Sequence, residues 1–482
     1  MDKLLQFAIF FLIYAGLLIM VAPAVRRSTT SRWLFIGCWS LYMAVQVFFF
    51  GDVLPVRFGE ERSSIGWSTL FMGKERRAAH DFLQKNCTLV DVSGDIELVP
   101  AQNVADDSLR VVITHRGRLL RLMRFLARHQ DLFDIVVQDV YFQHMHEADS
   151  ALHAQLVLLA DGGKLALAYD RSLATDRAIY DDPRLHNAFG EVREGLVGDL
   201  YFQNTIVGAT DRADGPVPLS LPYRAYCLLN NVDSLEWLNR LFGLAYEPSA
   251  TDPGWIELRH PPLFLMAEPD KALWNGLLEL LGVERAHVAT REGVGLGSGP
   301  TDGLEALAIP MGRLVKEIDE DPEAPFLQAM LRQRMTEEGP HVLVIGDFLD
   351  PGRDRHLTVQ GEMQGALMVT NLIYEFLNRR HRRPFRIFFL LWASLALILA
   401  LLVRRCSRPE RPPGPPSRHR GWRMVRRAVH GLFVKEFHYW ALFIILFVLQ
   451  VGLHRIVNIM AFAILLSVVE LVFRAYLPPD RA

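Results

Sequence analysis

The chain has 482 residues, half of them hydrophobic, and its formal net charge at pH 7 is -2. A nearly neutral chain has no overall field that would attract nucleic acid, so no nucleic-acid partner is expected. Its mean hydropathy of +0.14 is high for a soluble protein, and the apolar residues gather in blocks at the two ends. These features indicate a membrane protein with a water-soluble middle part, and they make the lipid bilayer its first partner.

Two uncharged runs follow one another at the amino end, Leu4–Val25 and Trp33–Phe50. Each is long enough to cross the roughly 30 Å hydrocarbon core of a bilayer. The short loop between them carries three arginines, and positive charge marks the cytoplasmic side of a membrane. Residues 1–51 are therefore predicted to form a transmembrane hairpin, and the domain that follows is predicted to lie outside the cytoplasm.

Short apolar strand patterns alternate with amphipathic helical patterns in the middle of the chain. The strand patterns cover 109–114, 133–140 and 164–169, and the helical patterns cover 119–126 and 151–159. This alternation with short links predicts an α/β domain with a mostly parallel sheet flanked by helices. Residues 170–260 are rich in Asp, Arg, Gly and Pro, and we interpret them as insertions and loops.

The most informative stretch begins at His341. Branched apolar residues run from His341 to Ile345 and predict a buried strand that ends at Gly346. A helix is predicted at 366–377, and it leads toward the next apolar block. The loop between strand and helix is polar and contains Asp347, Asp350, Gly352, Asp354 and His356. A loop at the carboxyl end of a strand is where α/β domains usually build a pocket.

This stretch resembles the CHASE2 family, the extracytoplasmic sensory domains of bacterial membrane receptors. The matching residues form a Gly-Asp pair, an Asp-x-His-x-Thr run and a Gly-x-Met-x-Gly-Ala run: Gly346, Asp347, Asp354, His356, Thr358, Gly361, Met363, Gly365 and Ala366. The strand–helix–strand unit before Asp139 is also similar to that family. Two features depart from it: His115 stands where the family's first strand often has an acid, and the amino-terminal spans are paired rather than single.

The resemblance implies a periplasmic sensory domain over residues 52–384, with an unknown small ligand. The candidate ligand-binding residues are Asp139, Asp347, Asp354 and His356, and the structural loop glycines are Gly346, Gly361 and Gly365. No catalytic residue, metal or cofactor is expected. The sequence has no GxSxG elbow, HExxH helix or kinase motif set, and the protein is therefore not expected to be an enzyme.

The carboxyl end is predicted to cross the bilayer three more times. A span at 385–404 is followed by a basic, Pro-rich linker at 405–436, and then by a second hairpin at 437–482. The arginines of the linker place it in the cytoplasm. With about five spans in total, two amino-terminal and three carboxyl-terminal, the protein is predicted to be a multi-pass protein of the bacterial inner membrane.

Three local alternatives stay open at this point. A cluster of imidazoles and carboxylates fits either a divalent transition metal or a solvated loop that enters a helix: His144, His146, Glu147, Asp149 and His153. Cys87 and Cys227 could form a disulfide in a periplasmic domain. Glu470 lies inside the last apolar run, where it should face protein or an end of the span: it could pair with His454 or Arg455, join helices, or simply lie at the membrane interface.

Two functions fit these observations. The first is an integral membrane sensor, which receives an extracytoplasmic signal and relays it through the membrane to a separate signalling protein. A partner is needed because no kinase or cyclase sequence follows Phe473. The alternative is a structural or scaffold component of a cell-envelope complex with no ligand of its own.

Overall fold

The computed structural model divides the chain into two compact units, residues 1–68 with 382–482 and residues 69–381. The structure describes residues 2–45, 73–100, 110–169, 177–185, 188–190, 193–197, 200–204, 206–209, 219–232, 246–248, 255–258, 307–350, 355–358, 361–378, 385–406, 437–453 and 459–476. Asp354 and the greater part of the predicted linker, 407–436, lie outside these residues.

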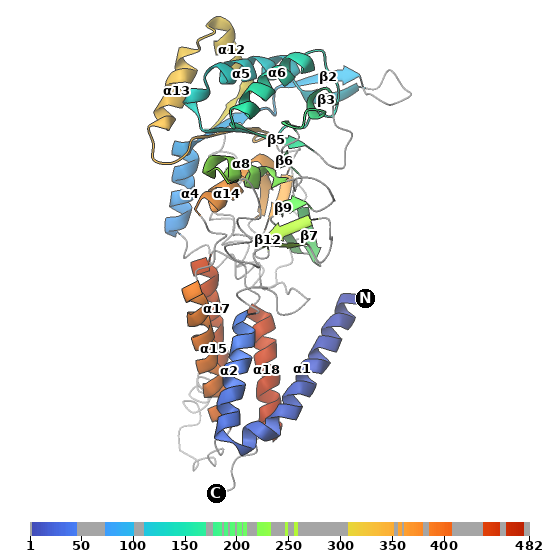
Figure 1. The fold of residues 1–482 in the computed structure, drawn as a ribbon, viewed down its shortest axis with the longest axis vertical. Helices are drawn as coiled ribbons and strands as arrows, with labels where there is room; N and C mark the ends of the chain where they lie inside the picture. The colour runs from blue at the N-terminus through green and yellow to red at the C-terminus, as the bar shows by residue number, and fades with distance from the viewer. Residues whose placement is uncertain are drawn as a thin grey trace, which may run out of the picture. The chain divides into compact units, whose positions relative to one another are not determined.

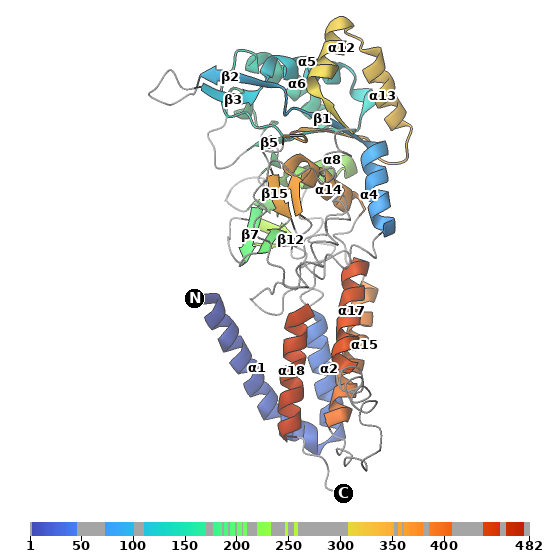
Figure 2. The same ribbon diagram turned by 180° about the vertical axis from the view of Figure 1, so that it is seen from behind.

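The first unit is helical in its described part (Figures 1 and 2). Its helices are α1 (Asp2–Arg27), α2 (Thr29–Val45), α15 (Phe385–Cys406), α17 (Phe437–Leu453) and α18 (Ile459–Tyr476). They pack together on a shared apolar core that includes Leu18, Met43, Leu399, Leu446 and Phe462. Long apolar runs form helices because a helix satisfies every backbone polar group within one segment.

One helical segment in the described residues is long and apolar enough to cross a membrane, Phe388–Cys406 of α15. The other apolar helical segments of this unit, counted only over residues whose side chains the structure describes, are Leu12–Val25, Tyr439–Val448 and Phe462–Phe473. Helix α2 begins with the polar residues Thr29–Arg32 and is described only as far as Val45. The prediction of five spans is therefore not supported; one segment qualifies by length and composition.

Glu470 is buried within this helical unit, with 6% of its surface exposed. Its carboxylate accepts a hydrogen bond of 2.9 Å from the hydroxyl of Tyr439. The contact joins α18 to α17, as expected for a polar group inside an apolar bundle. His454 and Arg455, the other predicted partners, lie outside the described residues.

The second unit is an α/β fold around a sheet of ten strands, as the sequence predicts (Figure 1). Its strand order is β11-β12-β9-β10-β6-β5-β4-β14-β1-β13. The run from β13 to β10 is parallel, and β9, β12 and β11 extend it in antiparallel fashion. The strands are β1 (Cys87–Asp91), β4 (Ile135–Gln138), β5 (Leu165–Tyr169), β6 (Ala188–Phe189), β9 (Ile206–Ala209), β10 (Leu219–Ser220), β11 (Tyr246–Pro248), β12 (Trp255–Leu258), β13 (Ala308–Pro310) and β14 (Val342–Gly346).

Helices cover both faces of this sheet (Figures 1 and 2). One face carries α5 (Arg116–Arg128), α6 (Asp149–Asp161), α12 (Met311–Glu320) and α13 (Pro325–Met335). The other carries α8 (Leu221–Asn230) and α14 (Gly365–Leu377), with α4 (Gly73–Asn86) beside them. Strands buried on both faces are largely apolar, which is why β5 and β14 read as continuous hydrophobic runs and β4 has one polar residue, Gln138.

The first strand of the sheet is not the one predicted. The run predicted at 109–114 forms β3 (Arg110–Thr114), which pairs with β2 (Ile96–Pro100) in a separate two-stranded ribbon. The first central strand is β1, and it ends in an acid, Asp91. His115 follows the ribbon instead, immediately before α5 (Arg116–Arg128).

The region 170–260 also departs from its interpretation as insertions and loops. It supplies β6, β9, β10, β11, β12 and the buried helix α8, together with the separate pair β7 (Arg193–Val197) and β8 (Leu200–Asn204). Pro222 lies in the first turn of α8, where a missing N–H costs nothing. Cys87 and Cys227 are both buried, on β1 and α8, and no disulfide joins them.

Helix α14 approaches the end of β14 closely. A Cβ atom added at Gly346 would lie 2.6 Å from the Cβ of Ala366 and 3.4 Å from that of Asp139. Every residue of α14 from Gly365 to Phe376 is buried. Gly346 therefore owes its place to packing, because a larger residue would push α14 away from the sheet.

We expect Gly346→Ala to lower the free energy of unfolding by about 1–3 kcal/mol, the usual cost of overpacking a core. Adding Ala366→Gly should restore at least half of that loss, because it removes the opposing methyl group. Urea unfolding of the full-length protein in detergent, followed by circular dichroism, measures both. Gly94→Ala is the control, because nothing lies within 4 Å of its added methyl group. Equal losses for the Gly346 and Gly94 variants would contradict the packing role.

His341 begins the same strand region and is fully buried. Its Nδ1–H donates to the carbonyl of Leu132 at 3.0 Å, so its Nε2 accepts from the hydroxyl of Thr88 at 2.9 Å. Its backbone N–H donates to the Asp134 carboxylate. Burial lowers the pKa of His341 from 6.5 to about 4, because the charged imidazolium loses its hydration.

This lowered pKa makes stability depend on pH. Between pH 6.5 and about 4 the unfolded chain binds a proton that the folded chain excludes, so stability is complete at pH 7 and falls as the pH drops. From pH 7 to pH 5 the loss should be about 2 kcal/mol. Urea titrations at both pH values should show that His341→Gln, which cannot titrate, loses about that much of the pH dependence. The control variant His129→Gln, at a half-buried position, should keep the pH dependence of the wild type. Identical pH dependence in the wild type and the His341 variant would refute this assignment.

Candidate functional site

The carboxyl ends of three adjacent parallel strands bring acids to one edge of the sheet. Strand β1 ends at Asp91, β14 leads into Asp347, and β4 leads into Asp139. The backbone N–H of Asp139 donates to the carbonyl of Ile345 at 2.8 Å, which continues the pairing of β4 with β14. The structure thus places Asp139 and Asp347 at the same edge, and their roles in ligand binding stay predictions.

Asp91 was missed in the sequence, and it organises the loop after β14. Its buried carboxylate accepts hydrogen bonds from the backbone N–H groups of Phe348 at 2.9 Å and Leu349 at 3.2 Å. It also accepts one from the hydroxyl of Ser93 at 2.6 Å. The signal was present as the run Cys87–Asp91, an apolar strand that ends in an acid, as the strand before Asp347 does.

The remaining predicted residues follow along the same loop. The carboxylate of Asp347 accepts from the backbone N–H of Asp350 at 3.1 Å, which is turn chemistry. His356 lies in β15 (Arg355–Thr358), where its backbone pairs with that of Met363 in β16 (Gly361–Gln364). Gly361 opens β16 and Gly365 opens α14. Asp354 lies outside the described residues, so the structure brings together part of the predicted set.

A second polar cluster lies where α5 and α6 begin. The guanidinium of Arg116 is fully buried, 4.2 Å from the ring centre of Phe142, and its Nε lies 3.5 Å from a carboxylate oxygen of Asp149. The backbone N–H of Arg116 donates to Glu97 at 2.6 Å. A buried cation next to a buried acid lowers the cost of burying both, and the pair fixes the starts of the two helices.

Histidines flank Glu97 in this cluster. His115 Nδ1 lies 3.5 Å from one carboxylate oxygen, and His146 Nε2 lies 3.7 Å from the other. The backbone N–H of Ala148 donates to His146 Nδ1 at 3.1 Å, so the proton of the neutral ring is on Nε2, toward Glu97.

The residues for which a metal was one of two open interpretations do not converge. Asp149 accepts from the backbone N–H of His146 and faces Arg116, while His153 faces Asp182 at 3.2 Å. Among the described residues, no group of three or more His, Cys, Asp or Glu side chains has the arrangement of a metal site. His146, Asp149 and His153 contact groups at the start of α6 and neighbouring side chains instead.

The ribbon β2–β3 supplies acids to two helix starts. Asp95 accepts from the backbone N–H of Gly312 at the start of α12 at 2.7 Å, and also binds the guanidinium of Arg118. Glu97 likewise accepts a hydrogen bond from a backbone N–H at the start of α5, that of Arg116. The positive ends of these helices are therefore occupied by the protein's own carboxylates rather than offered to an external anion.

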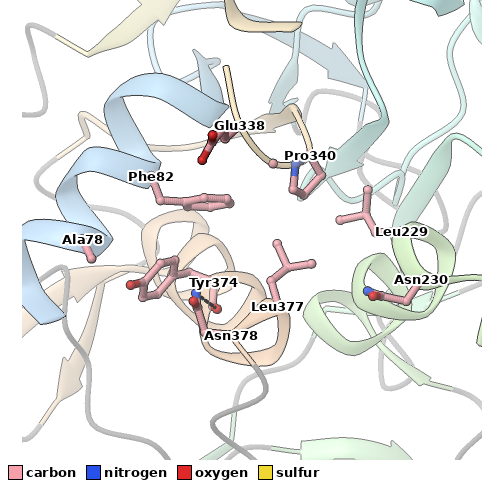
Figure 3. Close-up of a pocket in the computed structure, with 10 residues that line it drawn as sticks. Ala78, Phe82, Leu229, Asn230, Glu338, Pro340, Tyr374, Leu377 and Asn378 are labelled. Carbon is pink, nitrogen blue, oxygen red and sulfur yellow. Dashed lines mark hydrogen bonds between the residues drawn. The ribbon is translucent and has the colours of Figure 1, made fainter. Parts of the chain in front are cut away.

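A pocket lies at the opposite, amino edge of the sheet, within the second unit (Figure 3). Its volume is about 670 Å³, within the range typical of small-molecule sites. It is formed by α4, by the end of α8, by the turn before β14 and by the last turn of α14. Figure 3 shows Phe82, Pro340, Leu229 and Leu377 around the same open space. The sequence predicted a pocket at the other edge, in the 347–365 loop.

Hydrogen bonds and ring contacts hold the walls of this pocket. The ring of Phe82 lies 5.3 Å from that of Tyr374, which joins α4 to α14. The buried amide of Asn86 donates to the Glu338 carbonyl at 2.9 Å and fixes the turn. Gly339 in that turn has a φ of +104°, a conformation that favours glycine.

No family model matches this sequence, and no curated protein or solved structure is significantly similar to it. The CHASE2 resemblance accordingly stays a prediction from the residues quoted above. The fold itself defines the class: an α/β unit with a parallel sheet flanked by helices, carried on one chain with an apolar helical unit.

We expect Asp91→Ala to free the loop after β14. Hydrogen–deuterium exchange of the full-length protein should be faster at Phe348 and Leu349 by tenfold or more, because one buried and one part-buried N–H group lose their acceptor. Ser93→Ala is the matched control: it removes a donor to the same carboxylate and should leave these two amides nearly unchanged. Unchanged exchange in the Asp91 variant would show that the loop is held by other contacts.

Proposed function

We propose that this protein is an integral membrane sensor of the CHASE2 type, which receives an extracytoplasmic signal and relays it through the membrane to a separate partner. The proposal places the α/β unit in the periplasm of a bacterium, with two amino-terminal and three carboxyl-terminal spans. Asp139 and Asp347, which lie at the carboxyl edge, remain its candidate ligand residues, together with Asp354 and His356. No catalytic step is assigned to them.

One observation carries the proposal: the connection between α14 and α15. Helix α14 is buried from Gly365 to Phe376, ends at Leu377 in the wall of the pocket, and is followed along the chain by α15 from Phe385. α15 contains the segment that is long and apolar enough to cross a membrane. A ligand that shifts the end of α14 would therefore act within a few residues of a span, which is the arrangement a relay needs.

The distribution of arginines supports the same topology. Arg404 and Arg405 end α15, and many more follow in the predicted linker. Five arginines between Arg379 and Arg386 also precede the span, but the nine from Arg404 to Arg427 form the larger cluster, and the larger cluster marks the cytoplasmic end. In that position they also bind anionic lipid headgroups, at about 1 kcal/mol each. The α/β unit precedes α15 in the chain, so it belongs on the other side.

The topology can be tested with single cysteines in a background that lacks the four natural ones. We expect Leu200→Cys to react with a membrane-impermeant maleimide in intact spheroplasts, and Pro415→Cys to react only after the membrane is permeabilised. The physical reason is that the reagent reaches only the outer face of a sealed membrane. Labelling of both positions from the same side would overturn the proposed orientation.

The partner separates the sensor from the alternative, a scaffold in a cell-envelope complex. Affinity purification of the tagged full-length protein from detergent-solubilised membranes should recover a kinase, cyclase or diguanylate cyclase if the protein relays a signal. Recovery of envelope-assembly proteins alone would favour the scaffold. The control is a variant with two residues inserted in the segment between Asn378 and Phe385. The same purification should recover the intact complex, but the activity of the recovered partner should no longer respond to the signal.

A further inference from the structure

The pocket at the amino edge is lined by both apolar and polar groups, and polar atoms form the larger part of its exposed lining. Figure 3 shows the side chains of Phe82, Leu229, Pro340 and Leu377 around its centre. Among the described residues that line it, the one acidic side chain is that of Glu338. Hydrophobic and aromatic side chains together with placed polar groups are the usual lining of a small-molecule site.

Hydrogen bonds orient the amides on the rim. The Nδ2 of Asn230 donates to the carbonyl of Tyr226 at 2.9 Å, and the Nδ2 of Asn378 donates to that of Tyr374, also at 2.9 Å. Each bond uses one of the two N–H groups of the side-chain amide within its own helix. This fixes the direction of the amide, whose oxygen is a hydrogen-bond acceptor for a ligand and whose second N–H is a donor.

Two helices end at this pocket. Helix α8 ends at Asn230 and α14 at Leu377, and both residues line the cavity. The carboxyl end of a helix carries a partial negative charge, equivalent to roughly half an elementary charge. These two ends and the Glu338 carboxylate therefore give the pocket a negative potential.

Aromatic faces add to the preference for a cation. The rings of Phe82 and Tyr374 lie 5.3 Å apart and tilted, and in Figure 3 the Glu338 carboxylate points toward Phe82. A cation between the carboxylate and the ring would gain attraction from both.

From these contacts we propose that the pocket binds a small organic cation: an ammonium group held at the Glu338 rim, with an apolar body among Phe82, Leu229 and Leu377. The site lies at the amino edge of the sheet, away from Asp139 and Asp347 at the carboxyl edge. The inference names the ligand class of the sensor and in that respect rests on the proposed function. Binding itself requires only the pocket.

The probe is 2-phenylethylammonium, added to the full-length protein in nanodiscs and followed by isothermal titration calorimetry. Two analogues of similar shape isolate the charge: 2-phenylethanol is neutral and 3-phenylpropanoate is an anion. We expect the cation to bind with a dissociation constant at or below about 1 mM. The anion should bind at least tenfold more weakly, with the alcohol between them.

Variants locate the binding. Glu338→Gln should weaken binding of the cation about threefold and leave that of the alcohol unchanged, since one partly solvated charge contact is lost. Glu337→Gln is the matched control, an exposed acid one residue earlier that does not line the pocket. Ala78→Trp places a large side chain at the pocket wall without removing a contact that holds it, and should abolish binding.

Three results would overturn the inference: no binding of the cation, equal or tighter binding of the anion, or equal effects of the two glutamate variants. Arg379 and Arg380 follow Asn378 in the sequence, and a preference for the anion would point to them. Hydrogen–deuterium exchange separates the two proposals. A cation that binds without changing exchange in α14 or α15 supports the inference and counts against the relay. If the cation does not bind but periplasmic extract changes exchange in α15, the inference is refuted and the relay still stands.

Discussion

The packing of α14 is the constraint on which the second unit depends. A helix buried on all sides cannot be moved without losing contacts over its whole length, and α14 is buried from Gly365 to Phe376. It starts against Gly346, where the absence of a side chain lets Ala366 approach the sheet. It ends in the pocket at the opposite edge. One rigid element therefore joins the acidic loops at the carboxyl edge to the cavity at the amino edge.

The acids at the carboxyl edge largely serve the backbone. Asp91 holds the loop after β14, while Asp95 and Glu97 occupy the starts of α12 and α5. Each such contact satisfies a donor that would otherwise be buried without an acceptor, at a cost of about 1–3 kcal/mol. An edge rich in carboxylates thus arises from the requirements of helix starts and tight loops. The carboxylates that led us to predict a pocket at the carboxyl edge are therefore explained by these backbone contacts, and the cavity lies at the amino edge instead.

Local pattern was sufficient for part of this fold. The strand before Gly346 and the helix after it were predicted because a branched apolar run and a helical period are strong signals. Strand β1 was missed because α4 passes into it at Cys87 with no turn residue between them. Strand β3 was assigned to the central sheet because a five-residue apolar run looks the same in a ribbon. The pocket had no sequence signal, since its walls come from four distant segments with ordinary amphipathic patterns.

The burial of α14 also limits how a relay along this chain can work. Sliding or rotating the whole helix would break the contact of Ala366 with Gly346 and expose apolar surface, at several kcal/mol. Its last turn is different, because Leu377 is half-buried and Asn378 is exposed. A small ligand can shift an equilibrium only by its difference in affinity for the two states, typically a few kcal/mol. That is enough to order or release one helical turn, so a signal passing from the pocket toward α15 would act at residues 374–378 and leave the sheet unchanged.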